Sequence, residues 1–240
     1  MRLAILTGGS KGLGLALCER LANRGYRVIE FSRTAPHAYS VKLDLSSPGE
    51  SRLVATTAIA ALSGERFSEI LVINNAGTLH PIGPASSKEP EETLANLNTN
   101  FTSAILVLTE IVAHFQADAC RKVLANISSG AAQKGYAGWS LYCAAKAGME
   151  NYVRALALEQ QGETHPFIPV NIDPGVMDTE MQTCIRNSSA SDFPEIQRFI
   201  KRKEQGALVE PVKVAAAVCR ILELPSLIAG SRYEVSDHGA

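Results

Sequence analysis

Short runs of apolar and β-branched residues alternate along this chain with longer segments of helical periodicity. This alternation is typical of βαβ units, in which helices cover both faces of a parallel sheet. We predict seven strands, at residues 3–7, 27–32, 41–44, 70–74, 122–128 and 168–173, with a last one near 233–235. The sequence therefore favours an α/β fold with a seven-stranded parallel sheet.

The predicted helices lie between these strands and begin near Gly12, Ser51, Glu91, Ser140 and Pro211. The first should stop at Gly25, because glycine tolerates a positive φ. Right-handed crossovers would give a single doubly wound Rossmann-type domain over residues 1–240. Ligands bind such sheets outside the carboxyl ends of the strands, so the residues that follow strand ends should converge there: Gly8, Asn75, Ser129 and Pro174.

Two segments are long for plain connections, residues 77–90 and residues 174–206. Long loops in compact domains are usually functional. The second contains a helical pattern over 192–204 and is expected to form a lid over the ligand crevice. The alternative is a surface excursion without a role in binding.

Composition excludes several classes of protein. Of 240 residues, 46% are hydrophobic, and 23 basic against 24 acidic residues leave a net charge of −1. Neither nucleic acid nor an anionic membrane is therefore an expected partner. No segment resembles a signal peptide or a membrane span, and the five cysteines form no C-x-x-C pair, which disfavours disulfides and a metal site. We expect a cytoplasmic protein.

A glycine-rich turn follows the first predicted strand, with the sequence Thr-Gly-Gly-Ser-Lys-Gly-Leu-Gly over residues 7–14. Glycines let the backbone approach a pyrophosphate, and a helix N-terminus supplies free N–H donors. The expected contacts to a dinucleotide are Gly8, Ser10, Lys11, Gly12, Leu13 and Gly14. Further along the chain we expect contacts from Asp44, Leu45, Asn75, Ala76 and Gly77.

The end of the second strand should read the 2′ position of the cofactor's ribose. A carboxylate there binds a free diol, whereas a basic residue accommodates a 2′-phosphate. Here Ser32 occupies the carboxylate position and Arg33 follows it, which predicts NADP(H), with Lys11 as a second cation. The alternative is that Glu30 binds the ribose.

Tyr142 and Lys146 lie four positions apart in a predicted helix and therefore share one face. An ammonium beside a phenol favours the charged form of the phenol. At about 5 Å and an effective dielectric of about 20, the interaction is roughly 3 kcal/mol, or about two pKa units. We therefore expect the pKa of Tyr142 to be lowered toward working pH, where general acid–base catalysis is most effective.

Taken together, these motifs resemble those of the short-chain dehydrogenase/reductase family. The resemblance rests on the glycine turn, Asn-Asn-Ala-Gly at 74–77, Asn100, Ser129, Tyr142, Lys146 and Pro174-Gly175, all in the family's order. It implies that Tyr142 is the general acid in carbonyl reduction and that Ser129 binds the substrate oxygen. It also implies that Lys146 binds the nicotinamide ribose and that Asn100 anchors a water relay.

The same resemblance implies cofactor contacts from Tyr142, Lys146, Pro174, Gly175, Val176 and Thr179. Within the family, residues 174–182 and the stretches around Ser129 and Tyr142 resemble the sepiapterin reductases and bacterial benzil reductases. Those enzymes reduce a carbonyl next to a second carbonyl. The substrate candidates are Ser129, Tyr136, Trp139, Met181 and Asp237, although Asp237 could equally be a solvated carboxylate, and Tyr136 and Trp139 could serve loop packing.

Three points stay open at this level. Ser128 could face the site instead of Ser129, although the spacing to Tyr142 favours Ser129. The activity could be that of a 3-oxoacyl thioester reductase or another short-chain alcohol dehydrogenase, or the chain could be a cofactor-sensing protein without chemistry. The resemblance further suggests a homodimer or homotetramer built on the helices that start near Glu91 and Ser140.

Overall fold

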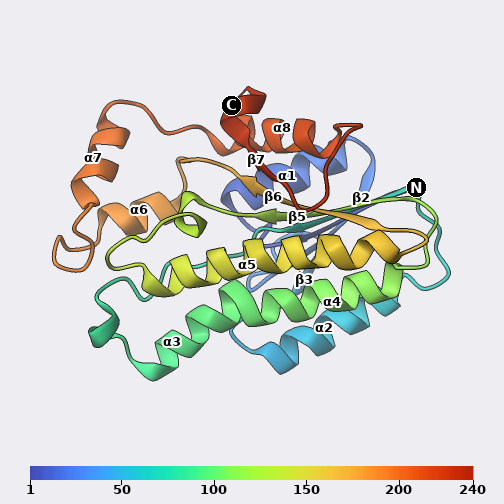
Figure 1. Cartoon of the computed structure of the whole chain (residues 1–240), viewed down its shortest axis with the longest axis horizontal. Helices are drawn as coiled ribbons and strands as arrows, with labels where there is room; N and C mark the ends of the chain where they lie inside the picture. Colours follow the sequence, from blue (N-terminus) through green and yellow to red (C-terminus); the bar gives the residue numbers. More distant parts are fainter. Residues whose placement is uncertain (240) are drawn as a thin grey trace.

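A parallel sheet forms the centre of the molecule, with helices packed on both of its faces (Figure 1). The computed structural model describes residues 1–239. The strands are β1 Arg2–Thr7, β2 Tyr26–Ser32, β3 Ser40–Lys42, β4 Glu69–Asn74, β5 Arg121–Ile127, β6 Phe167–Asp173 and β7 Arg232–Glu234. Their order in the sheet is β3-β2-β1-β4-β5-β6-β7, and every pairing is parallel. The predicted doubly wound α/β fold is confirmed.

All seven predicted strands are present, and β3 differs most from its prediction because it ends at Lys42 instead of Asp44. The Asp44 carboxylate accepts a 2.9 Å hydrogen bond from the Ser46 N–H, which turns the chain toward the next helix. Local side-chain bonding of this kind competes with strand pairing.

The helices are α1 Gly12–Asn23, α2 Pro48–Ala60, α3 Pro90–Leu97, α4 Ser103–Phe115, α5 Ser140–Glu159, α6 Glu180–Arg186, α7 Ile196–Glu204 and α8 Pro211–Leu222. The helix predicted near Glu91 is two helices, α3 and α4, joined by a π-helical turn at Asn98–Thr102. Helix α6 was not predicted. Helix α7 begins four residues later than its pattern suggested, because the Ser189 hydroxyl accepts from the Asp192 N–H and holds a turn there.

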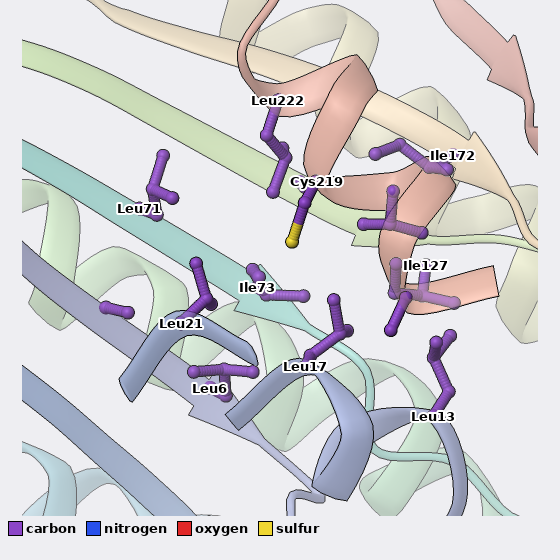
Figure 2. Close-up of a cluster of buried hydrophobic side chains, with 14 of the residues drawn as sticks. Leu6, Leu13, Leu17, Leu21, Leu71, Ile73, Ile127, Ile172, Cys219 and Leu222 are labelled. Carbon is purple, nitrogen blue, oxygen red and sulfur yellow. The ribbon is translucent and has the colours of Figure 1, made fainter. Parts of the chain in front are cut away.

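Helices α1 and α8 pack on one face of the sheet, and α2, α4 and α5 pack on the other. Figure 2 shows the first core, where Leu17 and Leu21 of α1 meet Cys219 and Leu222 of α8 over strand residues such as Ile73. These side chains are at most 1% exposed. Strands covered on both faces need apolar residues at consecutive positions, which explains the unbroken apolar runs in the sequence.

A polar row crosses the sheet near the carboxyl ends of its central strands. Thr7, Asn74, Asn126 and Asn171 are register partners on β1, β4, β5 and β6. Each side chain donates to the next, over distances of 2.9–3.1 Å. Because all four are buried, each lost bond would leave an unsatisfied polar group, so the row holds the strand ends in register.

Within residues 1–239, no helix combines the length and apolar character that crossing a membrane requires.

Candidate active site

The glycine turn packs against the end of β4 at distances that exclude a side chain. A Cβ on Gly8, whose φ is +74°, would lie 2.8 Å from the Cα of Ala76. A Cβ on Gly14 would lie 2.0 Å from the Gly8 carbonyl oxygen, and the Asn75 amide donates to that oxygen at 2.9 Å. The turn therefore leads directly into the N-terminus of α1, and helix N-termini of this kind bind phosphate groups.

Glu30 lies beneath this turn and is fully buried. Its carboxylate accepts from the Gly9 N–H at 2.8 Å and from the hydroxyls of Ser40 and Ser32 at 2.6 and 3.1 Å. Both carboxylate oxygens are thus occupied within the protein. The structure therefore argues against Glu30 as a ribose ligand and gives it a supporting role under the turn.

A groove of about 310 Å³ lies at the carboxyl ends of β2 and β3 and is lined by Arg33, Lys42, Leu43, Asp44 and Glu50. Ser32 and Lys42 are register partners at the ends of β2 and β3, so the two cations Arg33 and Lys42 flank one point. Lys42 was missed in the sequence, since its position follows only from the register of β3. Lys11 forms an exposed ion pair with Glu180 of α6, which places that cation toward residues 174–206.

Tyr142 and Lys146 occupy the same buried face of α5, as their spacing predicted. The Lys146 Nζ lies 5.6 Å from the centre of the Tyr142 ring and donates to the Ile127 carbonyl oxygen at 2.7 Å. Burial lowers the pKa of Lys146 to about 8, against weaker opposing effects of the Asp173 and Glu150 carboxylates.

The predicted lowering of the tyrosine's pKa is wrong for this structure. Burial raises the pKa of Tyr142 to about 12, and the Asp173 carboxylate adds to that rise, while a hydrogen bond from the Ser129 side chain opposes it. The prediction considered only the ammonium and not the loss of solvent around the phenol, which is the larger effect here. Tyr142 is therefore a protonated phenol at neutral pH.

Ser129 and Ser128 point to different surroundings. Ser129 caps the short 3₁₀ turn Gly130–Ala132, its hydroxyl accepting from the Ala131 N–H at 3.1 Å, and it adjoins Tyr142. Ser128 is 2% exposed and donates to Glu150 at 2.5 Å. This arrangement supports Ser129 as the serine at the site.

Asn100 lies in the π-helical turn and is buried. Its amide oxygen accepts from the Thr78 N–H at 2.9 Å, and its amide nitrogen donates to the Thr78 carbonyl oxygen at 2.8 Å. A Cβ built on Gly77 would lie 3.2 Å from that Asn100 oxygen and 3.9 Å from the Lys146 Nζ. The strand-end segment 77–78 thus brings Asn100 near Lys146.

Residues 174–206 pack on the N-terminal end of α5 through aromatic rings. Trp139 stacks on Phe193 with centroids 4.4 Å apart, and it contacts Tyr136, Tyr142 and Phe199 at 5.0–6.2 Å. Trp139 is 5% exposed, so the packing alternative applies to it at least in part, and Tyr136 and Met181 are partly buried beside this cluster.

The remaining candidates divide into two groups. Thr179 lies over the glycine turn, with its Cγ2 3.4 Å from where a Cβ of Gly12 would be, and Gly175 has a φ of +70° in the turn that follows Pro174. Asp237 is exposed in the C-terminal turn Val235–His238, where its carboxylate accepts from the neighbouring Ser236. The structure thus brings Thr179 to the glycine turn and leaves Asp237 exposed.

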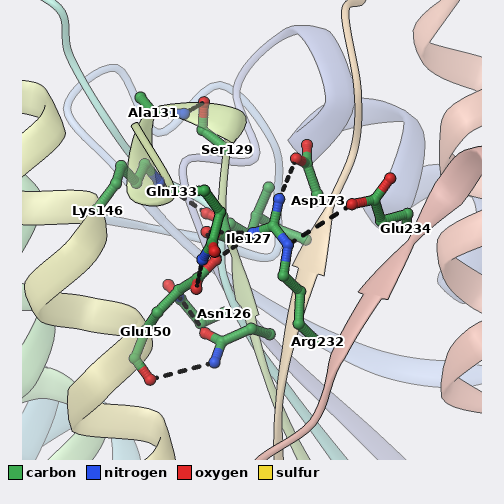
Figure 3. A network of polar contacts seen from close by, with 12 residues as sticks. Asn126, Ile127, Ser129, Ala131, Gln133, Lys146, Glu150, Asp173, Arg232 and Glu234 are labelled. Carbon is green, nitrogen blue, oxygen red and sulfur yellow. Dashed lines mark hydrogen bonds and ion pairs between the residues drawn. The ribbon is translucent and has the colours of Figure 1, made fainter. Parts of the chain in front are cut away.

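Sequence reasoning missed a partly buried ion cluster that joins α5 to β6 and β7, formed by Glu150, Asp173 and Arg232 (Figure 3). Glu150 follows Lys146 by one helical turn, and Asp173 directly precedes Pro174. The sequence could therefore have indicated that both residues lie near the candidate site. The sequence gives no such indication for Arg232, because only the strand order of the sheet brings β7 beside β6.

Comparison with known proteins agrees with this geometry. Residues 2–190 match the family model for the short chain dehydrogenases. The chain is 37% identical to a benzil reductase ((S)-benzoin forming) of Bacillus subtilis over 93% of this chain and 94% of that protein. It is 28% identical to the sepiapterin reductase of Xenopus tropicalis over 98% and 94% of the two chains. A short-chain dehydrogenase/reductase of Saccharomyces cerevisiae has the same fold, with a TM-score of 0.81 at 18% identity and full coverage of both chains.

The chain belongs to the short-chain dehydrogenase/reductase family, a family of oxidoreductases that bind nicotinamide cofactors. Among the relatives it resembles are enzymes named for the reduction of benzil and of sepiapterin.

Proposed function

We propose that this protein reduces a carbonyl to an alcohol with NADPH, and that its substrate carries a second carbonyl beside the first, as benzil does. The observation that carries the proposal is the grouping of Tyr142, Lys146 and Ser129 near a glycine turn that fits a dinucleotide. The likeness to the benzil reductase, which extends over more than nine-tenths of both chains, supports the substrate class.

The protein's own residues would supply the proton and the orientation. The cofactor, when bound, supplies the hydride. Ser129 would donate a hydrogen bond to the substrate oxygen and stabilise the negative charge that develops there. Tyr142 would then transfer its phenolic proton to the same oxygen. Because its pKa is raised to about 12, Tyr142 carries that proton throughout the neutral range.

Lys146 and Asn100 would return a proton to Tyr142. At neutral pH the Lys146 ammonium is charged, since its pKa is about 8, and it favours the phenolate that each turnover leaves. Asn100, which the Gly77 backbone brings near Lys146, would anchor a water that leads to solvent. Lys146 would also hold the nicotinamide ribose, as its position in the family's motif suggests.

Cofactor preference follows from the 2′ groove. Arg33 and Lys42 present two cations at the end of β2, where a 2′-phosphate would carry about two negative charges. Asp44 and Glu50 also line the groove, and their charges would repel a phosphate unless the two cations bind it directly. We propose that both cations do so.

Residues 174–206 would act as a lid. Thr179 lies over the glycine turn and Phe193 stacks on Trp139, the residue before α5, so the segment spans the two halves of the site. Closure would exclude water from the transfer step.

The direct test is NADPH consumption with a panel of benzil, sepiapterin and a 3-oxoacyl thioester, with product stereochemistry determined by chiral chromatography. Benzil should be the best substrate of the three and should yield one benzoin enantiomer. A preference for the thioester by an order of magnitude or more would contradict the proposal.

A further inference from the structure

A partly buried ion network lies beside Tyr142 and Lys146 and joins three elements of the fold (Figure 3). The Arg232 guanidinium on β7 donates to the carboxylate of Glu150 on α5 and to that of Asp173 at the end of β6. The Glu150 side chain is 1% exposed and the Asp173 side chain 14%. Two carboxylates with so little solvent require a compensating charge, and Arg232 supplies it.

The Glu150 end of the network holds the serine segment. Its carboxylate accepts from the Ser128 hydroxyl at 2.5 Å and from the Gln133 amide at 2.6 Å. Ser128 and Gln133 flank Ser129 and the short turn that Ser129 caps. Any movement of the Glu150 carboxylate would therefore move the hydroxyl proposed to bind the substrate oxygen.

The Asp173 end holds the turn after β6. The Asp173 carboxylate accepts from the Gly175 N–H at 2.9 Å, which fixes the Pro174-Gly175 turn where residues 174–206 begin. Asp173 receives Arg232 on its other oxygen. One guanidinium thus ties together the segment that carries Ser129 and the segment that leads to Thr179.

We propose that Arg232 and Glu150 are positioning residues of this enzyme, which place Ser129 and set the electric field at Tyr142 and Lys146 without touching the substrate. This inference rests on the proposed function, in which Tyr142 and Lys146 transfer the proton.

The charged groups around Tyr142 and Lys146 determine how substitutions in the network should shift the pKa of Tyr142. Burial has the largest effect on both groups: it raises the pKa of Tyr142 and lowers the pKa of Lys146. The Asp173 carboxylate raises both pKa values, and the Glu150 carboxylate raises that of Lys146. The Cys143 thiol, next to Tyr142 in the chain, also raises the pKa of Tyr142. Two exposed groups contact the network: Arg154 on α5, 3.5 Å from Glu150, and Glu234 on β7, 3.8 Å from Arg232. Arg232 contacts both the Glu150 and the Asp173 carboxylates.

The sign of each substitution follows from this arrangement. Arg232→Met leaves Asp173 without its ion-pair partner and Glu150 with only the exposed Arg154, and the added negative charge disfavours a phenolate at Tyr142 and raises its pKa. Glu150→Gln removes one negative charge while Arg232 stays paired with Asp173, and this change favours the phenolate and lowers that pKa. A role limited to structural support would destabilise both variants but would not shift them in opposite directions.

The experiment measures the pH dependence of alcohol oxidation with NADP⁺, a reaction that requires a deprotonated Tyr142. At a fixed pH on the rising limb, below the pKa of Tyr142, the rate should fall about tenfold in Arg232→Met and rise by a similar factor in Glu150→Gln, which corresponds to pKa shifts of about one unit. Arg232→Lys, which keeps the charge, should fall between wild type and Arg232→Met. Arg154→Met, which removes an exposed arginine from the same carboxylate, should leave the profile in place.

A second readout needs no activity. Trp139 is the single tryptophan of the chain, and its ring centroid lies 6.2 Å from that of Tyr142, so the phenolate should quench its fluorescence. An alkaline titration of this fluorescence, with Tyr142→Phe to give the contribution of Tyr136, reports the same shifts. If Arg232→Met fails to fold, the shifts in Glu150→Gln and Arg232→Lys, which should have opposite signs, test the proposal.

Opposite shifts in both readouts support the proposal, whereas unchanged profiles or shifts in one direction overturn it. Failure of the proposed function would look different, because wild-type protein would then be inactive on every carbonyl while the fluorescence titration still reported on the network.

Discussion

The indole ring of Trp139 and the phenyl ring of Phe193 are parallel, with their centroids 4.4 Å apart. Trp139 precedes helix α5, and Phe193 belongs to residues 174–206, so this stack joins the proposed lid to the helix that carries Tyr142. Phe193 is fully buried. The same segment also contacts Trp139 through Phe199 and pairs Glu180 with Lys11, so loss of the Phe193 ring should loosen it without unfolding the sheet.

Phe193→Ala should therefore weaken substrate binding more than overall stability. Loss of the stack and its buried area costs about 3 kcal/mol locally, and we expect KM for the carbonyl substrate to rise about tenfold. Phe115→Ala is the matched control, because Phe115 is equally buried but lies in the core between the sheet and α4. The control should lower the free energy of unfolding by about 3–5 kcal/mol and leave KM unchanged. Steady-state kinetics and urea unfolding of both variants decide the point, and an unaltered KM in Phe193→Ala would count against the lid.

Arg33→Asp should reduce the preference for NADPH over NADH. A hydrogen bond to a charged phosphate contributes about 1.5–3 kcal/mol, so the ratio of kcat/KM values should fall at least tenfold. Lys42→Asp should act in the same direction, since both side chains line the groove. Arg66→Asp, an exposed arginine shortly before the opposite end of β4, controls for the change in net charge. The ratio measured with one carbonyl substrate tests the assignment, which fails if Arg33→Asp and Arg66→Asp behave alike.

Gly9→Ala should displace the glycine turn, because the added Cβ would clash with side chains packed beneath the turn. Its Cβ would lie 2.2 Å from the Cγ of Glu30 and 2.6 Å from the Sγ of Cys18, both fully buried. Overpacking of this kind costs about 1–3 kcal/mol, and the displaced turn should bind NADPH at least tenfold more weakly. Gly49→Ala meets nothing within 4 Å in α2 and should be neutral or stabilising by up to about 1 kcal/mol. Urea unfolding and NADPH titration compare the two, and equal nucleotide affinity would refute the predicted distortion.

The sequence predicted the architecture well. Strands buried on both faces appear as short continuous apolar runs, whereas helices show apolar residues at helical spacing, so the two patterns can be told apart. It also placed Tyr142 and Lys146 on one helix face. It gave the wrong direction for the pKa of Tyr142, since residue spacing reveals a neighbouring charge but not how completely the phenol loses water. The π-helical turn at Asn100 and the contact of Arg232 with Glu150 depend on tertiary packing, which local patterns do not contain.

Lys146 should make stability depend on pH. Burial lowers its pKa in the folded state to about 8, below the ordinary value of 10.5, so the unfolded chain binds more protons between these pH values. Stability attributable to this lysine therefore rises as the pH increases from about 8 toward 10.5. Relative to Lys146→Met, wild type should gain about 2 kcal/mol of unfolding free energy between pH 7 and pH 10. Lys213→Met removes an exposed ammonium as the control. Urea unfolding at both pH values measures the difference, and a decrease for wild type would reverse the assigned sign.

Tyr142→Phe tests the central claim most directly, through the rate of benzil reduction by NADPH measured alongside NADPH affinity. We predict that the rate falls by about 10²–10⁴-fold, the contribution of a general acid, while NADPH binds as tightly as it does to wild type. A variant that keeps wild-type turnover with the phenol removed would contradict the account.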